Sequence, residues 1–137
     1  MHSNTYLNFN GNCEEAMNFY AKSFGAKIQA SMTHENAPPQ QGIPAEWRKK
    51  ILHAQFAIGD SVVMASDAPP GYYSASQGFS LSLTLDTAAD AERVFKDLSQ
   101  GGTVRAPMGQ SFFANRFGMV TDRFGIPWIV IQGAQGA

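Results

Sequence analysis

The sequence predicts an α+β domain built from two similar βαβββ modules. An alternating strand, a capped helix and a terminating glycine occur in the same order twice, about 74 residues apart when counted from Asn12 to Asp86. Three further segments of strand character follow each helix. The chain has 137 residues, of which 44% are hydrophobic, and this length suits one domain with a substantial core.

The first module begins with a half-buried strand. Residues 5–10 alternate between polar and apolar side chains, which indicates a strand with one covered face. Residues 13–24 have apolar side chains at three-to-four spacing and predict a helix, with Asn12 able to cap its start and Gly25 to end it. The strand segments that follow are 27–33, 50–58 and 61–66.

The second module repeats this order. Residues 79–85 show the strictest alternation in the chain, and Asp86 or Thr87 is expected to cap a helix over 88–99. The strand segments that follow this helix are 103–108, about 112–121 and 127–132. The last two form a hairpin whose turn contains Gly125, a residue that adopts a positive φ without steric cost.

These segments set the expected organisation of the chain. We expect a single domain over 1–137, with module one at 4–67, module two at 78–133 and a linker at 68–77. Residues 34–47 are rich in proline, glycine and glutamine and have no periodicity, so they predict a mobile loop.

Composition and charge exclude several classes of partner. The net charge is −1 and there is no basic run, so we expect no nucleic-acid binding. No apolar run approaches 18 residues, which argues against a membrane span. The single Cys13 cannot form an internal disulfide, which favours a cytoplasmic protein. Only 15% of residues are charged, and this low value favours burial of part of the surface against a second copy of the chain.

The chemical motifs of common enzymes are missing. His2, His34 and His53 have no metal-ligand spacing, and His53 is more often explained as a half-exposed strand residue than as a functional one. There is no Gly-x-Ser-x-Gly, Walker or Gly-x-Gly-x-x-Gly motif, and nucleotide, phosphoryl and nicotinamide chemistry are disfavoured.

Carboxylates give no sign of an acid–base pair. Asp67, Asp86 and Asp122 fall at strand ends or turns, where aspartate usually caps a helix or closes a turn. We therefore predict no catalytic residue from the sequence.

Two passages resemble a known family. Residues 6–20 with Phe24-Gly25-Ala26, and residues 116–128 from Arg116 to Trp128, are similar to the PhnB-like family. That family belongs to the vicinal-oxygen-chelate superfamily, with glyoxalase I, bleomycin-resistance proteins and extradiol dioxygenases. The resemblance implies the glyoxalase/bleomycin resistance/dioxygenase fold, in which two βαβββ modules curl around a cleft that a homodimer often completes.

The resemblance also implies where a metal would sit. Metal-using members place one ligand on each of four strands, and these positions match Asn4, Met64, Ser80 and Ile129 here. None is His or Glu, and a divalent cation needs imidazole, carboxylate or thiolate donors. We therefore predict no cofactor and disfavour a divalent metal. PhnB-like sequences are sometimes labelled demethylubiquinone methyltransferases, but no glycine-rich strand–helix turn for a methyl-donor nucleotide is present.

The cleft implied by the resemblance has polar and apolar candidates. Ser80, Ser82 and Thr84 would offer hydroxyl groups if their strand lined it, and would be ordinary surface otherwise. Trp47 and Tyr72 are candidates for a lid. The candidate cleft residues are Tyr6, Asn8, Met64, Ser80, Ser82, Phe113 and Ile129.

Three functions remain open at this point. The expected one is a homodimeric protein that binds a small, partly apolar molecule in its cleft without the usual metal. The first alternative is a metal-dependent glyoxalase-, lyase- or dioxygenase-type enzyme with relocated ligands, such as His53 with Glu46. The second is a structural or regulatory dimer without a ligand.

Overall fold

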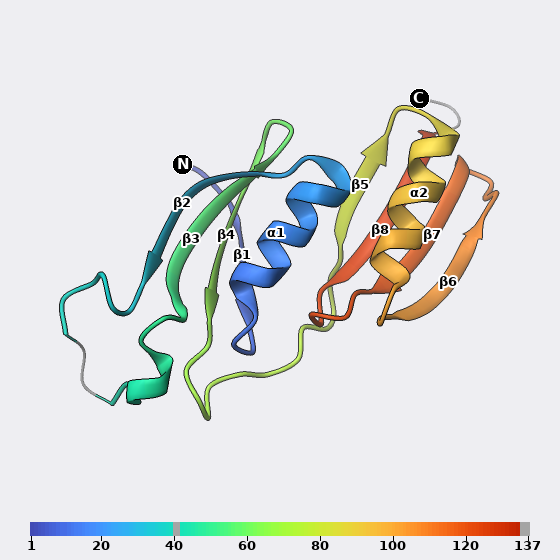
Figure 1. Cartoon of the computed structure of the whole chain (residues 1–137). Coiled ribbons are helices and arrows are strands. Elements are labelled where there is room, and N and C mark those ends of the chain that lie inside the picture. The colour runs from blue at the N-terminus through green and yellow to red at the C-terminus, as the bar shows by residue number, and fades with distance from the viewer. Residues whose placement is uncertain (40–41, 135–137) are drawn as a thin grey trace. The chain divides into compact units, whose positions relative to one another are not determined.

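The structure is a computed structural model that describes residues 1–39 and 42–134. The chain divides into two compact units, Met1–Ser74 and Ala75–Ala137. Each unit has one sheet and one α-helix (Figure 1). Gln40 and Gln41 of the predicted loop lie outside the described residues.

The first unit is a four-stranded mixed sheet with one helix on one face (Figure 1). Its strand order is β1-β4-β3-β2; β1 and β4 are parallel and the other neighbours are antiparallel. A short 3₁₀ helix, η1, precedes β3. The elements are β1 (Thr5–Phe9), α1 (Cys13–Phe24), β2 (Lys27–Thr33), η1 (Ala45–Trp47), β3 (Ile51–Ile58) and β4 (Ser61–Asp67).

The second unit repeats this topology. Its strand order is β5-β8-β7-β6, again with one parallel pair, β5 and β8, and α2 on one face (Figure 1). The predicted α+β architecture of two βαβββ modules is thus confirmed. The elements are β5 (Leu81–Leu85), α2 (Ala88–Ser99), β6 (Thr103–Gly109), β7 (Ala114–Thr121) and β8 (Pro127–Ala134).

Both helices have their predicted bounds, whereas three strands start later than expected, β3 by one residue and β5 and β7 by about two. Strand β5 begins at Leu81, which pairs with Trp128 of β8. Pro127, the residue of β8 before Trp128, has no N–H group and therefore cannot extend the β5–β8 hydrogen bonds beyond Leu81. Strand β7 begins at Ala114 because the Ser111 hydroxyl accepts the N–H groups of Phe113 and Ala114 and turns the chain there.

The side of each sheet that faces its helix forms the core. In the first unit Leu7, Phe9 and Phe56 are buried, and the Phe56 ring lies 6.0 Å from that of Tyr20 on α1. In the second unit the corresponding layer is buried too. It consists of Leu83, Trp128 and Val130 on the sheet and Val94 and Leu98 on α2. Burial of such side chains contributes roughly 1.5–3 kcal/mol each, so each layer stabilises the fold of its own unit.

The two helices are capped differently. Thr87 caps α2 as predicted, because its hydroxyl accepts the Asp90 N–H at 3.1 Å. Asn12 makes no side-chain capping bond, so the expectation for α1 was wrong. Instead the Asp67 carboxylate, at the end of β4, accepts the Cys13 N–H at 2.9 Å and the Ile51 N–H at 2.9 Å. A tertiary contact has taken over the role of the local cap.

Asp122 organises the β7–β8 hairpin. Its Oδ1 accepts the N–H groups of Phe124 and Ile126 at 2.9 and 3.0 Å, and its Oδ2 accepts the indole N–H of Trp128 at 2.8 Å. Gly125 has φ +90° in this turn, as the sequence predicted. Asp67 thus caps a helix and Asp122 closes a turn, as expected of aspartates at strand ends.

Candidate functional site

Each sheet has a side that its helix leaves uncovered. We call the uncovered side of the first sheet the first open face. Strand alternation puts Leu7, Ala54 and Ala65 on the buried side, so their neighbours point the other way. The first open face includes Lys27, Ala30 and Met32 of β2, together with Tyr6, Asn8, Gln29, His53, Gln55, Met64 and Ser66.

Tyr6 and His53 form a pair on the first open face. The Tyr6 hydroxyl lies 3.1 Å from His53 Nδ1, and the two ring centroids are 5.7 Å apart. Tyr6 is on β1 and His53 on β3, so the tyrosine reaches across the intervening strand β4. Tyr6 remains 44% exposed, which leaves the pair accessible.

Amide groups extend this polar surface. Gln55 Nε2 donates to Gln29 Oε1 at 2.8 Å, which joins β3 to the edge strand β2. Gln55 pairs in register with Met64, and Met64 with Tyr6, so these three side chains form a row across the sheet. The first open face is therefore mainly a hydrogen-bonding surface.

The second open face, on the sheet of the second unit, has a different character. The residues that neighbour Val120, Val130 and Leu83 along their strands point away from α2. Four of them are large, half-buried hydrophobic residues, and two on β5 carry hydroxyl groups. The second open face consists of Ser82, Thr84, Phe117, Met119, Ile129 and Ile131.

Two further candidates border the second open face. The Phe113 ring packs edge-on against Phe117, with centroids 5.1 Å apart. Ser80 precedes β5 instead of lying within it. The structure thus brings Ser82, Ile129 and Phe113 to one sheet, and Tyr6, Asn8 and Met64 to the other.

The two lid candidates lie in different surroundings. Trp47, at the end of η1, is half-buried beside Gly11, and the Lys50 ammonium lies 5.8 Å from the centroid of its ring. Tyr72 is 81% exposed in a turn. A lid role for either residue stays a prediction.

The four superfamily ligand positions do not provide the donors that a divalent metal needs. Asn4 donates its amide N–H to the Val62 carbonyl. Met64 has a thioether, Ser80 a hydroxyl group, and Ile129 no atom that can coordinate a metal. The alternative ligands do not converge either, because His53 is bonded to Tyr6 and Glu46 is exposed on η1. Within residues 1–39 and 42–134, no three His, Cys, Asp or Glu side chains are grouped to hold a metal ion.

Cys13 is not poised for chemistry. It is fully buried at the start of α1, and this burial, with the nearby Asp67 and Glu14 charges, raises the pKa of its thiol far above the ordinary value. The thiol therefore stays protonated, whereas a nucleophile or metal ligand must be a thiolate.

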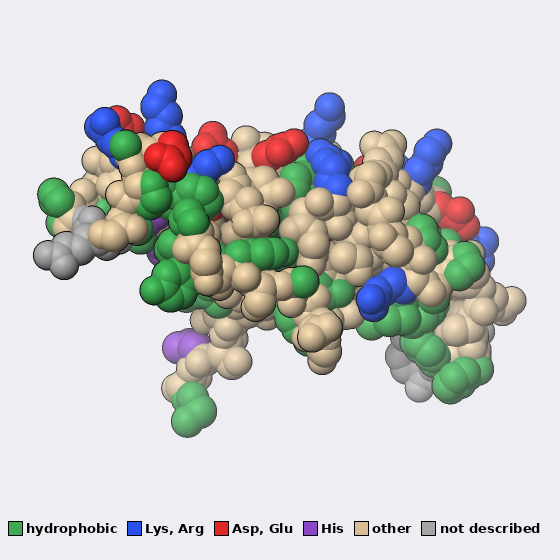
Figure 2. Space-filling model, turned by 90° about the horizontal axis from the view of Figure 1, so that it is seen from below, with side chains coloured by type: hydrophobic (Ala, Val, Ile, Leu, Met, Phe, Trp, Pro, Cys, Tyr) green, Lys and Arg blue, Asp and Glu red, His purple; other side chains and the backbone are tan. Residues whose placement is uncertain are grey.

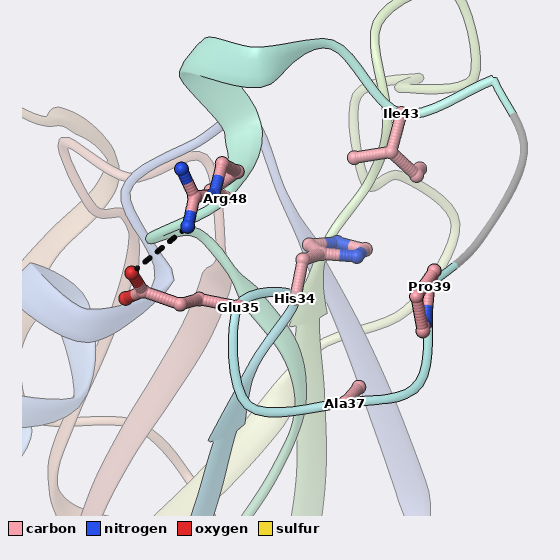
Figure 3. Close-up of a pocket in the computed structure, with 6 residues that line it drawn as sticks. All are labelled: His34, Glu35, Ala37, Pro39, Ile43 and Arg48. Atoms are coloured by element: carbon pink, nitrogen blue, oxygen red, sulfur yellow. Dashed lines mark hydrogen bonds and ion pairs between the residues drawn. The ribbon is translucent and has the colours of Figure 1, made fainter.

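The first unit has two hollows away from the candidate residues. One, of about 290 Å³, lies in the loop before η1, where the His34 ring points toward the space between Pro39 and Ile43 (Figure 3). The Glu35–Arg48 ion pair, at 3.3 Å, forms its opposite wall. The other, of about 440 Å³, lies at the start of α1 beside Lys50 and Asp67. Neither contains a predicted cleft residue.

The exterior carries mixed charge. On the face that Figure 2 shows, Lys and Arg side chains form no continuous patch, and several lie beside Asp or Glu. Arg116, for example, donates to Glu92 at 2.9 Å. Within the described part of the chain, no helix is both long and apolar enough to cross a membrane.

Known structures share this fold. A glyoxylase/bleomycin resistance protein/dioxygenase domain from Frankia aligns with all of this chain and 94% of its own, with a TM-score of 0.69 at 12% identity. A likeness at that identity shows the fold alone. The chain therefore has the glyoxalase/bleomycin resistance/dioxygenase fold.

More similar proteins narrow the class to a family. The family model described as 3-demethylubiquinone-9 3-methyltransferase matches residues 2–131. Protein PA1353 from Pseudomonas aeruginosa is 42% identical, with a TM-score of 0.87 over 97% of this chain and 98% of its own. A PhnB protein from Bacillus cereus is 27% identical, with a TM-score of 0.82 over 97% and 100%. Protein YjdN from Escherichia coli is 32% identical over 91% of this chain and 90% of its own. The chain belongs to this PhnB-like family.

The sequence left part of the open faces unnoticed. Phe117, Met119 and Ile131 are not among the sequence-based candidates, although they lie on strands that the sequence predicts. Their place beside Ile129 follows from the β7–β8 register, in which Met119 pairs with Ile129 and Phe117 with Ile131. The sequence favours an ordinary strand role for His53, because nothing local indicates its hydrogen bond to Tyr6, which is 47 residues away.

Proposed function

We propose that this protein binds a small, partly apolar molecule on its second open face, without a metal at the superfamily positions. The observation that carries this proposal is the second open face. It combines large half-buried hydrophobic residues, among them Met119 and Ile129, with the hydroxyl groups of Ser82 and Thr84. Ligand sites are typically apolar surfaces with a few placed polar groups.

The lost metal donors support a binding role over metal-dependent chemistry. Ile129 stands where the resemblance places a ligand, and it pairs with Ser82 and Met119 on either side. A hydrocarbon side chain at that position adds apolar contact area and offers no coordination. The activity in the family's description is not part of this proposal.

We further propose that two copies of the chain associate in the cytosol. Support for association comes from exposed hydrophobic residues, including Met32 at 45% and Phe112 at 90% exposure. A reducing compartment suits a chain with one buried cysteine. Light scattering after size-exclusion chromatography should give twice the monomer mass, and a monomer at all concentrations would contradict association.

A thermal-shift screen tests the binding proposal. Small molecules with an apolar body and one polar group should raise the melting temperature of the purified protein. At a 100-fold excess over Kd the stabilisation is about 2.7 kcal/mol. Elemental analysis of the same preparation should find zinc, nickel, manganese and iron far below one atom per chain.

Matched variants then assign binding to the second open face. Ile129→Ser should reduce the ligand-induced shift of each molecule found in the screen. Ile58→Ser is the control, because Ile58 is also half-buried but lies at the end of β3 in the first unit. It should lower the starting melting temperature and leave the ligand-induced shift in place. An absence of stabilising molecules, or an unchanged shift in Ile129→Ser, would contradict the proposal.

A further inference from the structure

The Tyr6–His53 pair gives the first open face a defined hydrogen-bonding direction. A neutral imidazole has one N–H group and one acceptor nitrogen. The Tyr6 hydroxyl is 3.1 Å from Nδ1, and we assign it as the donor because an imidazole nitrogen accepts better than a phenol oxygen. With Nδ1 as the acceptor, the proton of the ring sits on Nε2. Tyr6 thus leaves His53 with an Nε2–H group that donates to none of the described residues.

Among the described residues of the first unit, no acidic group on this face competes for that N–H. The uncovered side receives Asn8 from β1, Gln55 from β3 and Ser66 from β4, none of which is charged. From β2 it receives Lys27, Ala30 and Met32, which pair with Ala57, Gln55 and His53. Lys27 is a cation and accepts no hydrogen bond. The carboxylate of Asp67, the nearest acidic residue on β4, accepts the Cys13 and Ile51 N–H groups on the side of the sheet toward α1.

A second donor lies on the same face. Gln29 uses its amide oxygen to accept from Gln55 Nε2 at 2.8 Å, so its own NH₂ group remains available. Gln29 is exposed on β2, and Gln55 is two residues along β3 from His53. Both His53 and Gln29 therefore present N–H groups toward whatever lies on this face.

We infer that the first open face is a separate binding surface, which takes an acceptor oxygen of a small molecule, a carbonyl or carboxylate, through His53 Nε2–H. Tyr6 is a positioning residue, because it sets the tautomer of His53 without itself being the main contact. This inference goes beyond the proposed function, because it concerns the sheet of the first unit alone and names the class of molecule that this sheet binds: an apolar body with an acceptor oxygen. A group that can only donate would leave both N–H groups unpaired, which costs binding free energy.

Three probes of similar shape test this class. They are 1-naphthoate, 1-naphthamide and 1-methylnaphthalene, which have the same ring system and differ in whether they carry an acceptor oxygen. The two oxygen-bearing probes should bind about fivefold or more tightly than 1-methylnaphthalene, the effect of about one net hydrogen bond. Equal binding of all three would overturn the inference and leave the proposed function standing. Binding of none would count against both.

Substitutions assign the preference to His53. His53→Phe keeps a ring beside Tyr6 and removes both nitrogens. The preference for 1-naphthamide over 1-methylnaphthalene should fall to near unity, while the affinity for 1-methylnaphthalene stays within about twofold. His2→Phe is the control, since His2 is exposed ahead of β1 and should change neither value. A preference that survives in His53→Phe would overturn the inference.

Nitrogen NMR tests the positioning role of Tyr6 independently of any ligand. At about pH 8, where histidines are mostly neutral, the unprotonated ring nitrogen resonates well downfield of the protonated one. In the parent protein Nδ1 of His53 should be the downfield nitrogen, with the signals assigned by their loss in His53→Phe. In Tyr6→Phe the two shifts should move toward each other as the tautomers mix. Unchanged shifts in Tyr6→Phe would rule out the positioning role.

Discussion

The two units share a topology but differ on their open faces. In both, the first strand pairs parallel to the last and a 12-residue helix covers one side. The first open face carries the Tyr6–His53 and Gln29–Gln55 hydrogen bonds, whereas the second carries Phe117, Met119, Ile129 and Ile131. The helix-facing sides are apolar in both, because the core requires it. Packing constrains one side of each sheet and leaves the other free to carry different chemistry.

Each unit also uses a buried aspartate in its own way. Asp67 joins the end of β4 to the starts of α1 and β3, which are far apart in the sequence. Asp122 bonds groups within six residues of itself, including the Trp128 indole. The first unit thus depends on a tertiary clamp, and the second on a local one. Matched substitutions in the two units should distinguish these two kinds of clamp.

Asp122→Ala should destabilise the protein most, by about 3–5 kcal/mol, because it leaves three buried N–H groups without an acceptor. Asp67→Ala leaves only two N–H groups without an acceptor, so it should destabilise the protein by about 1 kcal/mol less than Asp122→Ala. Urea denaturation followed by circular dichroism measures both free energies of unfolding. A larger loss for Asp67→Ala would show that the tertiary clamp matters more than the local one.

Gly118→Ala should destabilise the second unit by about 1–3 kcal/mol through overpacking. A Cβ at Gly118 would lie 2.7 Å from Cε2 of Phe95 on α2. The corresponding residue of the first unit is Ala54, which pairs with Ala65 as Gly118 pairs with Val130. Ala54→Gly should cost only about 0.5–1 kcal/mol, the usual price of glycine in a strand. The same denaturation experiment measures both, and equal losses would contradict a tighter helix–sheet contact in the second unit.

The stability of the first unit should depend on alkaline pH through Cys13. Burial raises the pKa of this thiol in the folded chain, whereas an unfolded thiol ionises near pH 8.5. Above that pH the unfolded state loses a proton that the folded state keeps, so stability falls as pH rises. Between pH 8 and pH 10 the loss is about 2 kcal/mol.

The control for this pH dependence is Cys13→Ala. Alanine is the residue at the first position of α2, Ala88, so the substitution makes the two helix starts alike. Comparing free energies of unfolding at both pH values should show a smaller alkaline loss in Cys13→Ala. The same loss in both proteins would mean that other groups cause it.

Thr87→Ala should cost about 1 kcal/mol, because it removes the capping bond to the Asp90 N–H. Asn12→Ala at the start of α1 should cost less than about 0.5 kcal/mol, since Asn12 makes no capping bond and its Oδ1 is buried without a partner. Thermal melts of the two variants measure the difference. A larger loss for Asn12→Ala would mean that Asp67 does not replace the local cap.

Local sequence patterns were enough to predict the elements and their repetition. Period-2 and three-to-four spacing of apolar residues, with glycines and caps at their ends, predicted both helices to the residue and the order of all strands. These signals are local, because they arise from how each segment buries one of its sides. The apolar residue at Ile129 was equally visible, and with it the lack of the usual metal donors.

The contacts between distant residues could not be predicted in this way, because they depend on the tertiary structure. Tyr6 reaches His53 because β4 inserts between β1 and β3, and Asp67 caps α1 because β4 ends beside its start. Both contacts join residues about 50 positions apart, and no local pattern encodes such a pairing. Strand order and register, which are set by the packing of the whole sheet, turn scattered polar residues into a hydrogen-bonding surface.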